Sequence, residues 1–389
     1  MDKRVFVLLV LGINSIIVAR RLSIPNRISS AVKLGVGTGT AIIKNAPKFN
    51  PLQSPKEISA LGKEAILGLP WKVVLDRVNA ICSLALTTDN NLSRDTMDKQ
   101  DYENISMILY DDKENASFAL TEMDKLVQHP SFNENAPVVI LVTGWMSNRK
   151  NSISRVARSI YSAYKCRGDT NFIVLDTSDY ISSLYSWSAL NTEDVGKIVA
   201  SAVADLSKHV NASRIHLIGH SLGAQIVGAI GRYFHNFTSR LLPRITGLDP
   251  AFPCYNEGEV LSGIGRGDAA FVDIIHTNSH GFGIKEPIGD ADFYPNGVKV
   301  LMPGCFDIGC AHNRAVDYYI ESTLPGNENS FPATRCNSMK SYKQKKCNST
   351  TIPMGYATPP TAKGKYFLQT NAKRPYGKNS IENITCKSI

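Results

Sequence analysis

The chain has 389 residues, of which 43% are hydrophobic, and its formal net charge is +9. This size supports a large core and would accommodate two or three domains. The basic excess is scattered, and zinc-ligand spacings and RNA-binding signatures are absent from the sequence, so we expect no nucleic-acid partner. One dense basic run stands out at residues 340–346. We interpret it as a solvated loop, with contact to anionic lipid or polysaccharide as the alternative.

The amino-terminal residues have the pattern of a signal peptide. Lys3 and Arg4 precede an apolar core at residues 5–18, and Ile17 and Ala19 suit signal peptidase. The core is short for a membrane span, so a signal anchor is the lesser alternative. No later run reaches the length of a spanning helix. We therefore predict a signal peptide at residues 1–19 and a secreted, extracellular protein without an integral membrane span.

Cysteines and glycosylation sequons also favour export. The sequence has eight cysteines, an even number that suits disulfide pairing in an oxidising compartment. The natural local pairs are Cys305 with Cys310 and Cys336 with Cys347, which leave Cys82 with Cys166 and Cys254 with Cys386 as weaker assignments. Asn-x-Ser/Thr sequons occur at Asn91, Asn104, Asn115, Asn211, Asn236, Asn348 and Asn383.

Residues 20–85 form a basic extension with weak patterning. Ser54 begins a good helix start, and apolar residues recur at helical spacing after Pro70. We predict short helices that lie on a larger domain, with a pro-segment as the alternative. The main domain is expected at residues 86–378, followed by a tail at 379–389.

Strands and helices alternate from about residue 100 onward. Apolar runs predict strands at residues 105–110, 138–142, 172–175, 215–218, 245–248 and 271–276. An amphipathic helix capped by Asn191 comes before the fourth of these, and the segment from about residue 345 onward is rich in turn formers. This alternation predicts an α/β fold with a mostly parallel central sheet and helices on both faces.

The most informative motif is Gly219-His220-Ser221-Leu222-Gly223. It follows an apolar strand and leads into a helix rich in small residues, which is the context of a nucleophile elbow. Such a turn presents the serine hydroxyl above a parallel sheet. We therefore predict that Ser221 is a catalytic nucleophile of an α/β-hydrolase fold.

A serine nucleophile needs a base and an orienting acid, and in elbow hydrolases these follow in the order acid, then histidine. His312 is the favoured base, because it comes just after a probable disulfide. His276 fits a structural histidine better, and His280 precedes glycine in a loop. Asp249 is the favoured acid because it ends an apolar strand before Pro250.

Three other aspartates are rivals for the acid. Asp273 lies inside a strand, and Asp290 and Asp292 lie in a loop, so we expect structural roles for them. The oxyanion hole needs two backbone N–H groups. We expect them from Leu222 and from Trp145, which follows Gly144 at an early strand end. The chemistry requires no metal and no cofactor.

Several ordered motifs together resemble the animal pancreatic-type lipase family over residues 100–378. They are GHSLGAQIVG, GLDPA, VDIIHT, ADFYPNG and the CAHNRA segment, while VTGWMSN and LYSWSALNTEDVG resemble its insect secreted branch. The resemblance implies an α/β-hydrolase fold, a triad of Ser221, Asp249 and His312, and hydrolysis of glycerolipid or phospholipid esters through an acyl-enzyme at a lipid interface.

Departures from the family pattern refine this expectation. Thr143 stands where many members have histidine, and Cys305 and Cys310 enclose only residues 306–309, where large-lid members have a long flap. Such a loop is about one helical turn. We expect an open site with little interfacial activation, and an enzyme of phospholipase A1 or neutral glyceride lipase type. We expect neither a carboxyl-terminal β-sandwich nor colipase binding.

A catalytically silent lipid-binding protein is the rival hypothesis. Insect yolk proteins resemble this fold, but their elbow lacks the serine. Ser221 is present here together with both expected partners, which favours an enzyme.

Overall fold

A computed structural model describes residues 105–112, 114–144, 153–177, 191–252, 254–255, 261–347, 350–381 and 386. All of them belong to one compact unit, Cys82–Ile389. Several expectations fall outside the described residues, namely the signal peptide, the extension at residues 20–85, Cys82, Trp145, Asn91, Asn104, Asn348 and Asn383.

The unit is built on an 11-stranded sheet with the strand order β10-β9-β11-β8-β7-β6-β5-β3-β4-β1-β2. The strands are β1 Ser106–Leu109, β2 Ala116–Ala119, β3 Val138–Val142, β4 Asn171–Asp176, β5 Ile215–His220, β6 Arg244–Leu248, β7 Val272–Ile275, β8 Ala291–Pro295, β9 Pro332–Arg335, β10 Thr351–Pro353 and β11 Gly364–Leu368.

The central strands of the sheet are parallel. Parallel pairing joins β4 to β3, β3 to β5, and then β5 through β6, β7 and β8 to β11. Antiparallel strands lie outside this block, with β1 and β2 at one edge and β9 and β10 at the other. All residues of β3 and β4 are buried, as expected for parallel strands covered on both faces. This is the α/β-hydrolase type of sheet that the sequence predicts.

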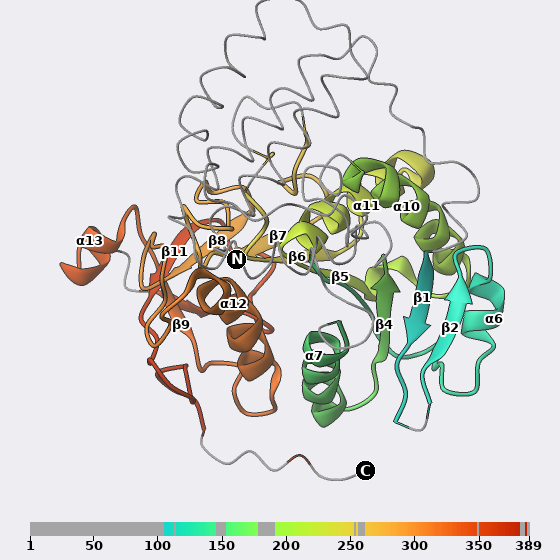
Figure 1. Ribbon diagram of the computed structural model, residues 1–389, viewed down its shortest axis with the longest axis horizontal. Helices are drawn as coiled ribbons and strands as arrows, with labels where there is room; N and C mark the ends of the chain where they lie inside the picture. Colours follow the sequence, from blue (N-terminus) through green and yellow to red (C-terminus); the bar gives the residue numbers. More distant parts are fainter. Residues whose placement is uncertain are drawn as a thin grey trace, which may run out of the picture. The chain divides into compact units, whose positions relative to one another are not determined.

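Helices cover both faces of the sheet (Figure 1). Helices α7 (Ile153–Arg167) and α12 (Ile308–Thr323) lie on one face, where Tyr164 and Tyr319 join them by a 2.7 Å hydrogen bond between their hydroxyls. Helices α10 (Thr192–His209) and α11 (Leu222–Thr238) pack together on the other face. Asn191 precedes α10 as expected, but its side chain does not form the cap hydrogen bond.

Two short helices and a 3₁₀ turn complete the described elements: α6 Met123–Val127, α13 Met339–Lys343 and η1 Ala212–Arg214. None of the helices in the described part of the chain is both long and apolar enough to cross a bilayer.

The disulfides correct part of the sequence analysis. Cys305 pairs with Cys310 and Cys336 with Cys347, as the local spacing favoured. Cys166 pairs with Cys386, 220 positions away, so the expected pairs Cys82–Cys166 and Cys254–Cys386 are both wrong. Cys254 is also disulfide-bonded.

Tertiary packing explains the Cys166–Cys386 bridge. The last turn of α7 reaches the end of α12, where Arg167 Nη1 donates to the Thr323 carbonyl over 2.8 Å. The carboxyl-terminal segment returns to the same place, because Ile381 N donates to Asn327 Oδ1 over 2.9 Å. The spacing of cysteines along the sequence does not reveal that the end of α7 and the carboxyl-terminal segment lie close together.

Candidate active site

The parallel register aligns the expected site residues along one edge of the sheet. Val142 of β3 pairs with Gly219 of β5, His220 of β5 with Leu248 of β6, and Leu248 with Ile275 of β7. Ser221 and Asp249 follow directly after β5 and β6. They therefore lie side by side at the carboxyl ends of adjacent strands, where open α/β sheets place their ligands.

Ser221 occupies a strained turn between β5 and α11. Its φ is 58° and its ψ is −125°, a backbone conformation that costs energy for a residue with a side chain. Backbone hydrogen bonds hold it there: Ser221 N donates to the Leu248 carbonyl over 3.0 Å, and Ala251 N donates to the Ser221 carbonyl over 3.1 Å. A side chain at position 223 would come within 2.3 Å of the Val142 carbonyl oxygen, so glycine is required for the close helix–strand contact.

Asp249 is a fully buried carboxylate whose two oxygens accept hydrogen bonds from different partners. Oδ1 accepts hydrogen bonds from Thr277 N at 2.7 Å and from Asn278 N at 2.9 Å. Oδ2 accepts from His312 Nδ1 at 2.5 Å. Because an ionised carboxylate only accepts hydrogen bonds, the proton of this bond belongs to Nδ1, and His312 Nε2 is left as an acceptor. This is the tautomer that a general base requires.

His312 is anchored by the start of α12. The Asp307 side chain caps the helix by accepting from Cys310 N at 2.7 Å, and the Cys305–Cys310 disulfide closes the preceding loop. The imidazole is only 8% exposed, and it lies 5.4 Å from the Phe282 ring and 4.7 Å from the His220 ring between centroids. The His312 imidazole is therefore held by packing as well as by Asp249.

His220 is a neighbour of the site that the sequence analysis did not single out. It precedes Ser221, and its Nε2 lies 3.4 Å from the His312 carbonyl oxygen, to which it is placed to donate. Burial, assisted by the nearby His312, lowers the pKa of His220 to about 3. The ring is consequently neutral near pH 7, and it links the serine turn to α12 without adding charge.

The loop after β3 lies directly against the serine. A Cβ atom added to Gly144 would be 2.5 Å from Ser221 Cβ and 3.0 Å from Ser221 Oγ. The backbone next to the Ser221 side chain therefore comes from the segment in which we expect one oxyanion donor. The other expected donor is the N–H group of Leu222. Leu222 is the first residue of α11, where backbone N–H groups lack partners within the helix.

The rival histidine and acids have structural partners. His276 Nδ1 donates to the Ile284 carbonyl over 2.8 Å, its Nε2 lies 2.9 Å from Asp292 Oδ1, and its ring stacks on Tyr294. Asp273 accepts from Arg244 Nε and Nη2, each at 2.8 Å. Asp290 accepts from the backbone of Val272, and His280 lies in the loop after β7 with a φ of 63°.

The His276–Asp292 pair has an indirect connection to the site. Both side chains are completely buried, and His276 is followed by Thr277 and Asn278, whose N–H groups bind Asp249. The pair therefore fixes the start of the loop whose N–H groups orient the Asp249 carboxylate. Backbone donors of this kind leave no signal in a single sequence.

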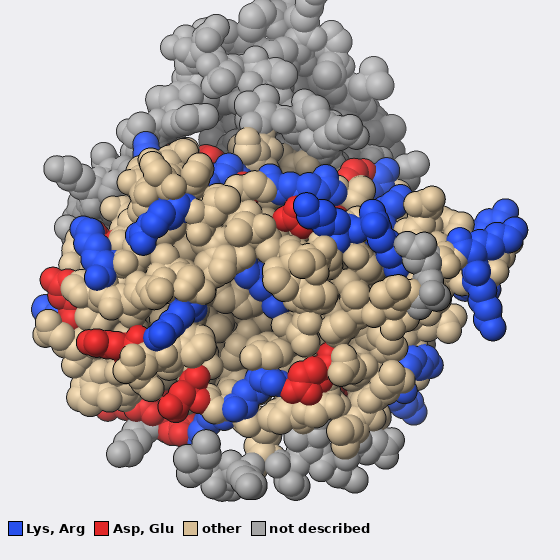
Figure 2. All heavy atoms as spheres, turned by 180° about the vertical axis from the view of Figure 1, so that it is seen from behind, with Lys and Arg blue, Asp and Glu red and all other residues tan. Residues whose placement is uncertain are grey.

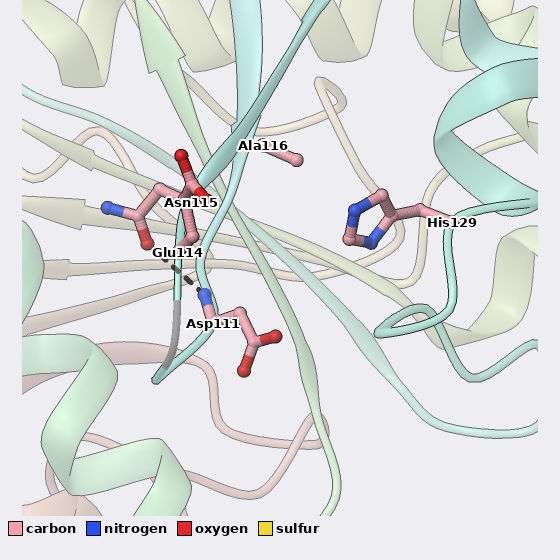
Figure 3. Close-up of a pocket in the computed structure, with 5 residues that line it drawn as sticks. All are labelled: Asp111, Glu114, Asn115, Ala116 and His129. Carbon is pink, nitrogen blue, oxygen red and sulfur yellow. Dashed lines mark hydrogen bonds between the residues drawn. The ribbon is translucent and has the colours of Figure 1, made fainter.

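A separate hollow lies at the β2 edge of the sheet, away from β5 and β6 in the strand order. Figure 3 shows its lining residues: Asp111, Glu114, Asn115, Ala116 and His129. Asp111 N donates to Asn115 Oδ1 over 3.2 Å. Among the described residues, no group of three His, Cys, Asp or Glu side chains is placed to hold a metal ion.

The fold and the site geometry define an α/β hydrolase with a serine elbow and an Asp–His pair behind it. The family model described as "Lipase" matches residues 71–376. The chain belongs to the lipase family.

Curated relatives include vitellogenins and lipoprotein lipases. The chain is 35% identical over 212 residues to Vitellogenin-1 of Ceratitis capitata, covering 54% of this chain and 48% of that protein. It is 37% identical over 220 residues to Vitellogenin-3 of Drosophila melanogaster, covering 56% and 52%. It is 30% identical over 300 residues to lipoprotein lipase of Neovison vison, covering 68% and 61%. The matched region thus spans only about half to two thirds of these relatives' length.

A solved structure of an α/β hydrolase, MGS-M1 from a deep-sea metagenome library, aligns with a TM-score of 0.28 at 13% identity, covering 48% of this chain and 74% of that chain. A likeness at this level carries no argument about activity.

Proposed function

We propose that this protein is a secreted carboxylic ester hydrolase that cleaves acyl esters of glycerolipids. The observation that carries the proposal is the 2.5 Å hydrogen bond between His312 Nδ1 and the buried Asp249 carboxylate, with Ser221 on the adjacent strand end. Ser221 directly follows β5, Asp249 directly follows β6, and His312 lies near the start of α12. The strained backbone of Ser221 supports the same conclusion, because such strain concentrates at functional sites.

The residues would act in the usual order of a serine hydrolase. Ser221 Oγ attacks the ester carbonyl carbon while its proton passes to His312 Nε2. The tetrahedral intermediate then collapses, the C–O bond to the leaving alcohol breaks, and His312 gives its proton to that oxygen. Water, deprotonated by His312, cleaves the acyl-enzyme and releases the fatty acid. Asp249 stays ionised throughout and stabilises the imidazolium.

The oxyanion would be held by the N–H groups of Leu222 and Trp145. Gly144 supports the second assignment, because it brings the β3 loop to the serine side chain. Losing one donor of this kind typically slows an enzyme by roughly a hundred- to a thousand-fold.

The loop between Cys305 and Cys310 supports a substrate proposal. The disulfide encloses residues 306–309, and α12 already begins at Ile308 within it. This loop is too short to cover a groove of lipid size, so we infer little interfacial activation. We propose a phospholipase A1-like or neutral glyceride lipase specificity that does not depend on colipase.

Secretion is supported by the features of the described surface. Asn115, Asn211 and Asn236, three of the expected sequons, are all exposed. Three disulfides in the described part of the chain also suit an oxidising compartment.

A catalytically silent, vitellogenin-like role is the second candidate. It is favoured by the two vitellogenins, which match this chain at 35% and 37% identity. The Asp249–His312 pair argues against it, because a silent protein has no use for a buried carboxylate that fixes a histidine tautomer. The two candidates differ in one measurable property, ester hydrolysis that depends on Ser221.

The test compares the purified full-length protein with its Ser221→Ala variant on phosphatidylcholine vesicles, emulsified triolein and a soluble short-chain ester. We expect the wild type to release fatty acid and the variant to lose activity by about 10⁵-fold or more. Equal inertness of both proteins on every ester would overturn the proposal in favour of the silent role. A sharp rate increase at the triolein interface would overturn the short-lid argument.

A further inference from the structure

We propose that a basic–apolar edge beside the site docks the protein onto anionic phospholipid surfaces. The edge combines three exposed apolar side chains with five exposed lysines: Val298, Leu301, Phe306, Lys299, Lys340, Lys343, Lys345 and Lys346. This inference deepens the proposed function by naming the kind of surface on which the substrate is met.

Two of the three apolar side chains of the edge flank a hydrogen-bonded turn. Val298 is 45%, Leu301 40% and Phe306 96% exposed. Cys305 N donates to the Met302 carbonyl over 3.0 Å, which closes a turn and brings the flanking residues Leu301 and Phe306 near each other. A nearly fully exposed phenylalanine next to a disulfide is unusual, because folded chains bury such side chains where they can. An apolar partner such as a bilayer would cover it.

The basic part lies against Gly297, the residue before Val298. A Cβ atom added to Gly297 would be 3.0 Å from both Cβ and Cγ of Met339, the first residue of α13. Met339 and Tyr342 pack on a buried cluster that contains Tyr294 and Phe367. This packing fixes α13 beside Val298 with its lysines in solvent. Figure 2 shows Lys and Arg side chains projecting at the right-hand side of the molecule, where α13 lies.

The lysines have no counter-charge within the described part of the chain. None of the ion pairs found there includes any of the five. The acid nearest in sequence to Phe306 is Asp307, and its carboxylate is used to cap α12. The edge therefore presents five lysines that are unpaired within the described residues, against the exposed carboxylate of Asp307, around apolar side chains. A basic apolar surface of this kind is the pattern that anionic lipid headgroups attract.

The position of the edge relative to the triad gives docking a function. Phe306 is followed by α12, which carries His312 near its start. Insertion of Phe306 would therefore bring this side of the active site to the lipid. A sulfated polysaccharide would use the lysines but not Phe306, and a second copy of the chain would face repulsion between like charges.

The experiment measures vesicle co-sedimentation of full-length protein carrying Ser221→Ala, so that no lipid is hydrolysed. We expect at least ten-fold tighter binding to vesicles of phosphatidylcholine with phosphatidylserine than to phosphatidylcholine alone. Phe306→Ser, and separately the replacement of the four lysines at 340, 343, 345 and 346 by glutamine, should each weaken this binding about ten-fold or more. The matched control is Phe237→Ser on α11, where an exposed phenylalanine (49%) should be replaceable with less than two-fold effect.

Several outcomes would overturn the proposal: equal binding to both vesicle types, binding unaffected by Phe306→Ser, retention on heparin that needs the lysines without any vesicle binding, or a dimer that Phe306→Ser dissolves. Failure of the proposed function is read separately. A soluble short-chain ester should be hydrolysed equally by wild type and Phe306→Ser. If wild type hydrolyses no ester but vesicle binding follows the pattern above, the docking surface stands and the catalytic proposal fails.

Discussion

Replacement of Asp249 by asparagine tests the orienting role proposed for this carboxylate while it preserves the packing around it. The two residues have nearly the same shape, and asparagine keeps one oxygen that can accept the N–H groups of Thr277 and Asn278 at 2.7 and 2.9 Å. The amide nitrogen then faces His312 Nδ1, where Oδ2 accepted at 2.5 Å. Because an amide N–H donates, Nδ1 must become an acceptor and the ring proton moves to Nε2.

The size of the expected effect follows from this tautomer change. With a proton on Nε2, His312 cannot take the proton of Ser221. Loss of the correct tautomer lowers kcat by about 10⁴-fold in a serine protease with its acid converted to the amide. We expect a loss of the same order here, with little change in KM and only a small change in thermal stability.

The assay is kcat on a soluble short-chain ester, with the melting temperature measured on the same preparations. The matched control is Asp273→Asn, a second buried aspartate, which binds Arg244 over 2.8 Å. Leaving Arg244 unpaired should cost about 3–5 kcal/mol of stability, while kcat of the folded protein changes little. Activity of Asp249→Asn within ten-fold of wild type, or a larger kcat loss in the control, would refute the reasoning.

Three further predictions concern Gly144, His220 and the Cys166–Cys386 disulfide. Gly144→Ala places a Cβ atom 2.5 Å from Ser221 Cβ, so kcat on a soluble ester should fall about a hundred-fold, and an unchanged kcat contradicts the contact. Burial lowers the pKa of His220 from 6.5 to about 3, so only the unfolded chain takes up this proton as the pH falls. The folded protein therefore keeps its full free energy of unfolding above pH 6.5, and about 3 kcal/mol of that free energy should be lost by pH 4.5 because of His220. Guanidinium unfolding at pH 7 and 4.5 should show a smaller loss in His220→Gln, and equal losses would contradict the assignment. Replacing both Cys166 and Cys386 by serine opens a loop of 220 positions and should lower the free energy of unfolding by about 2–5 kcal/mol. The guanidinium midpoint should fall accordingly, and an unchanged midpoint would contradict the stabilising role of this disulfide.

The sequence predicts the centre of this fold well because the centre is locally encoded. The apolar runs that become β3, β4 and β5 are buried on both faces, so they stand out without knowledge of their neighbours. The glycines that flank Ser221 predict the nucleophile elbow, because this signal is also local in the sequence. Ser221 and Asp249 each follow the last residue of a strand. Because these two strands are adjacent and parallel, their register places both residues at the carboxyl ends of the sheet.

The carboxyl-terminal strands were not predicted. β10 and β11 lie in a segment rich in turn formers, and β11 gains its place by pairing with β8, which is distant in the sequence. The Cys166–Cys386 bridge escaped prediction for a similar reason, because it depends on how α7 and the chain end pack near α12. The backbone donors to Asp249 belong to the same group, since any residue type at those positions supplies an N–H.

Covalent labelling of Ser221 tests the central claim most directly. A fluorophosphonate ester phosphonylates an active-site serine only when a base activates it, so the reagent reports a working triad without any assumption about the lipid substrate. The full-length protein should take up one equivalent of reagent, located to Ser221 by peptide mass spectrometry, and Ser221→Ala should take up none. A folded wild type that remains unlabelled under conditions that label a known serine esterase would contradict the account.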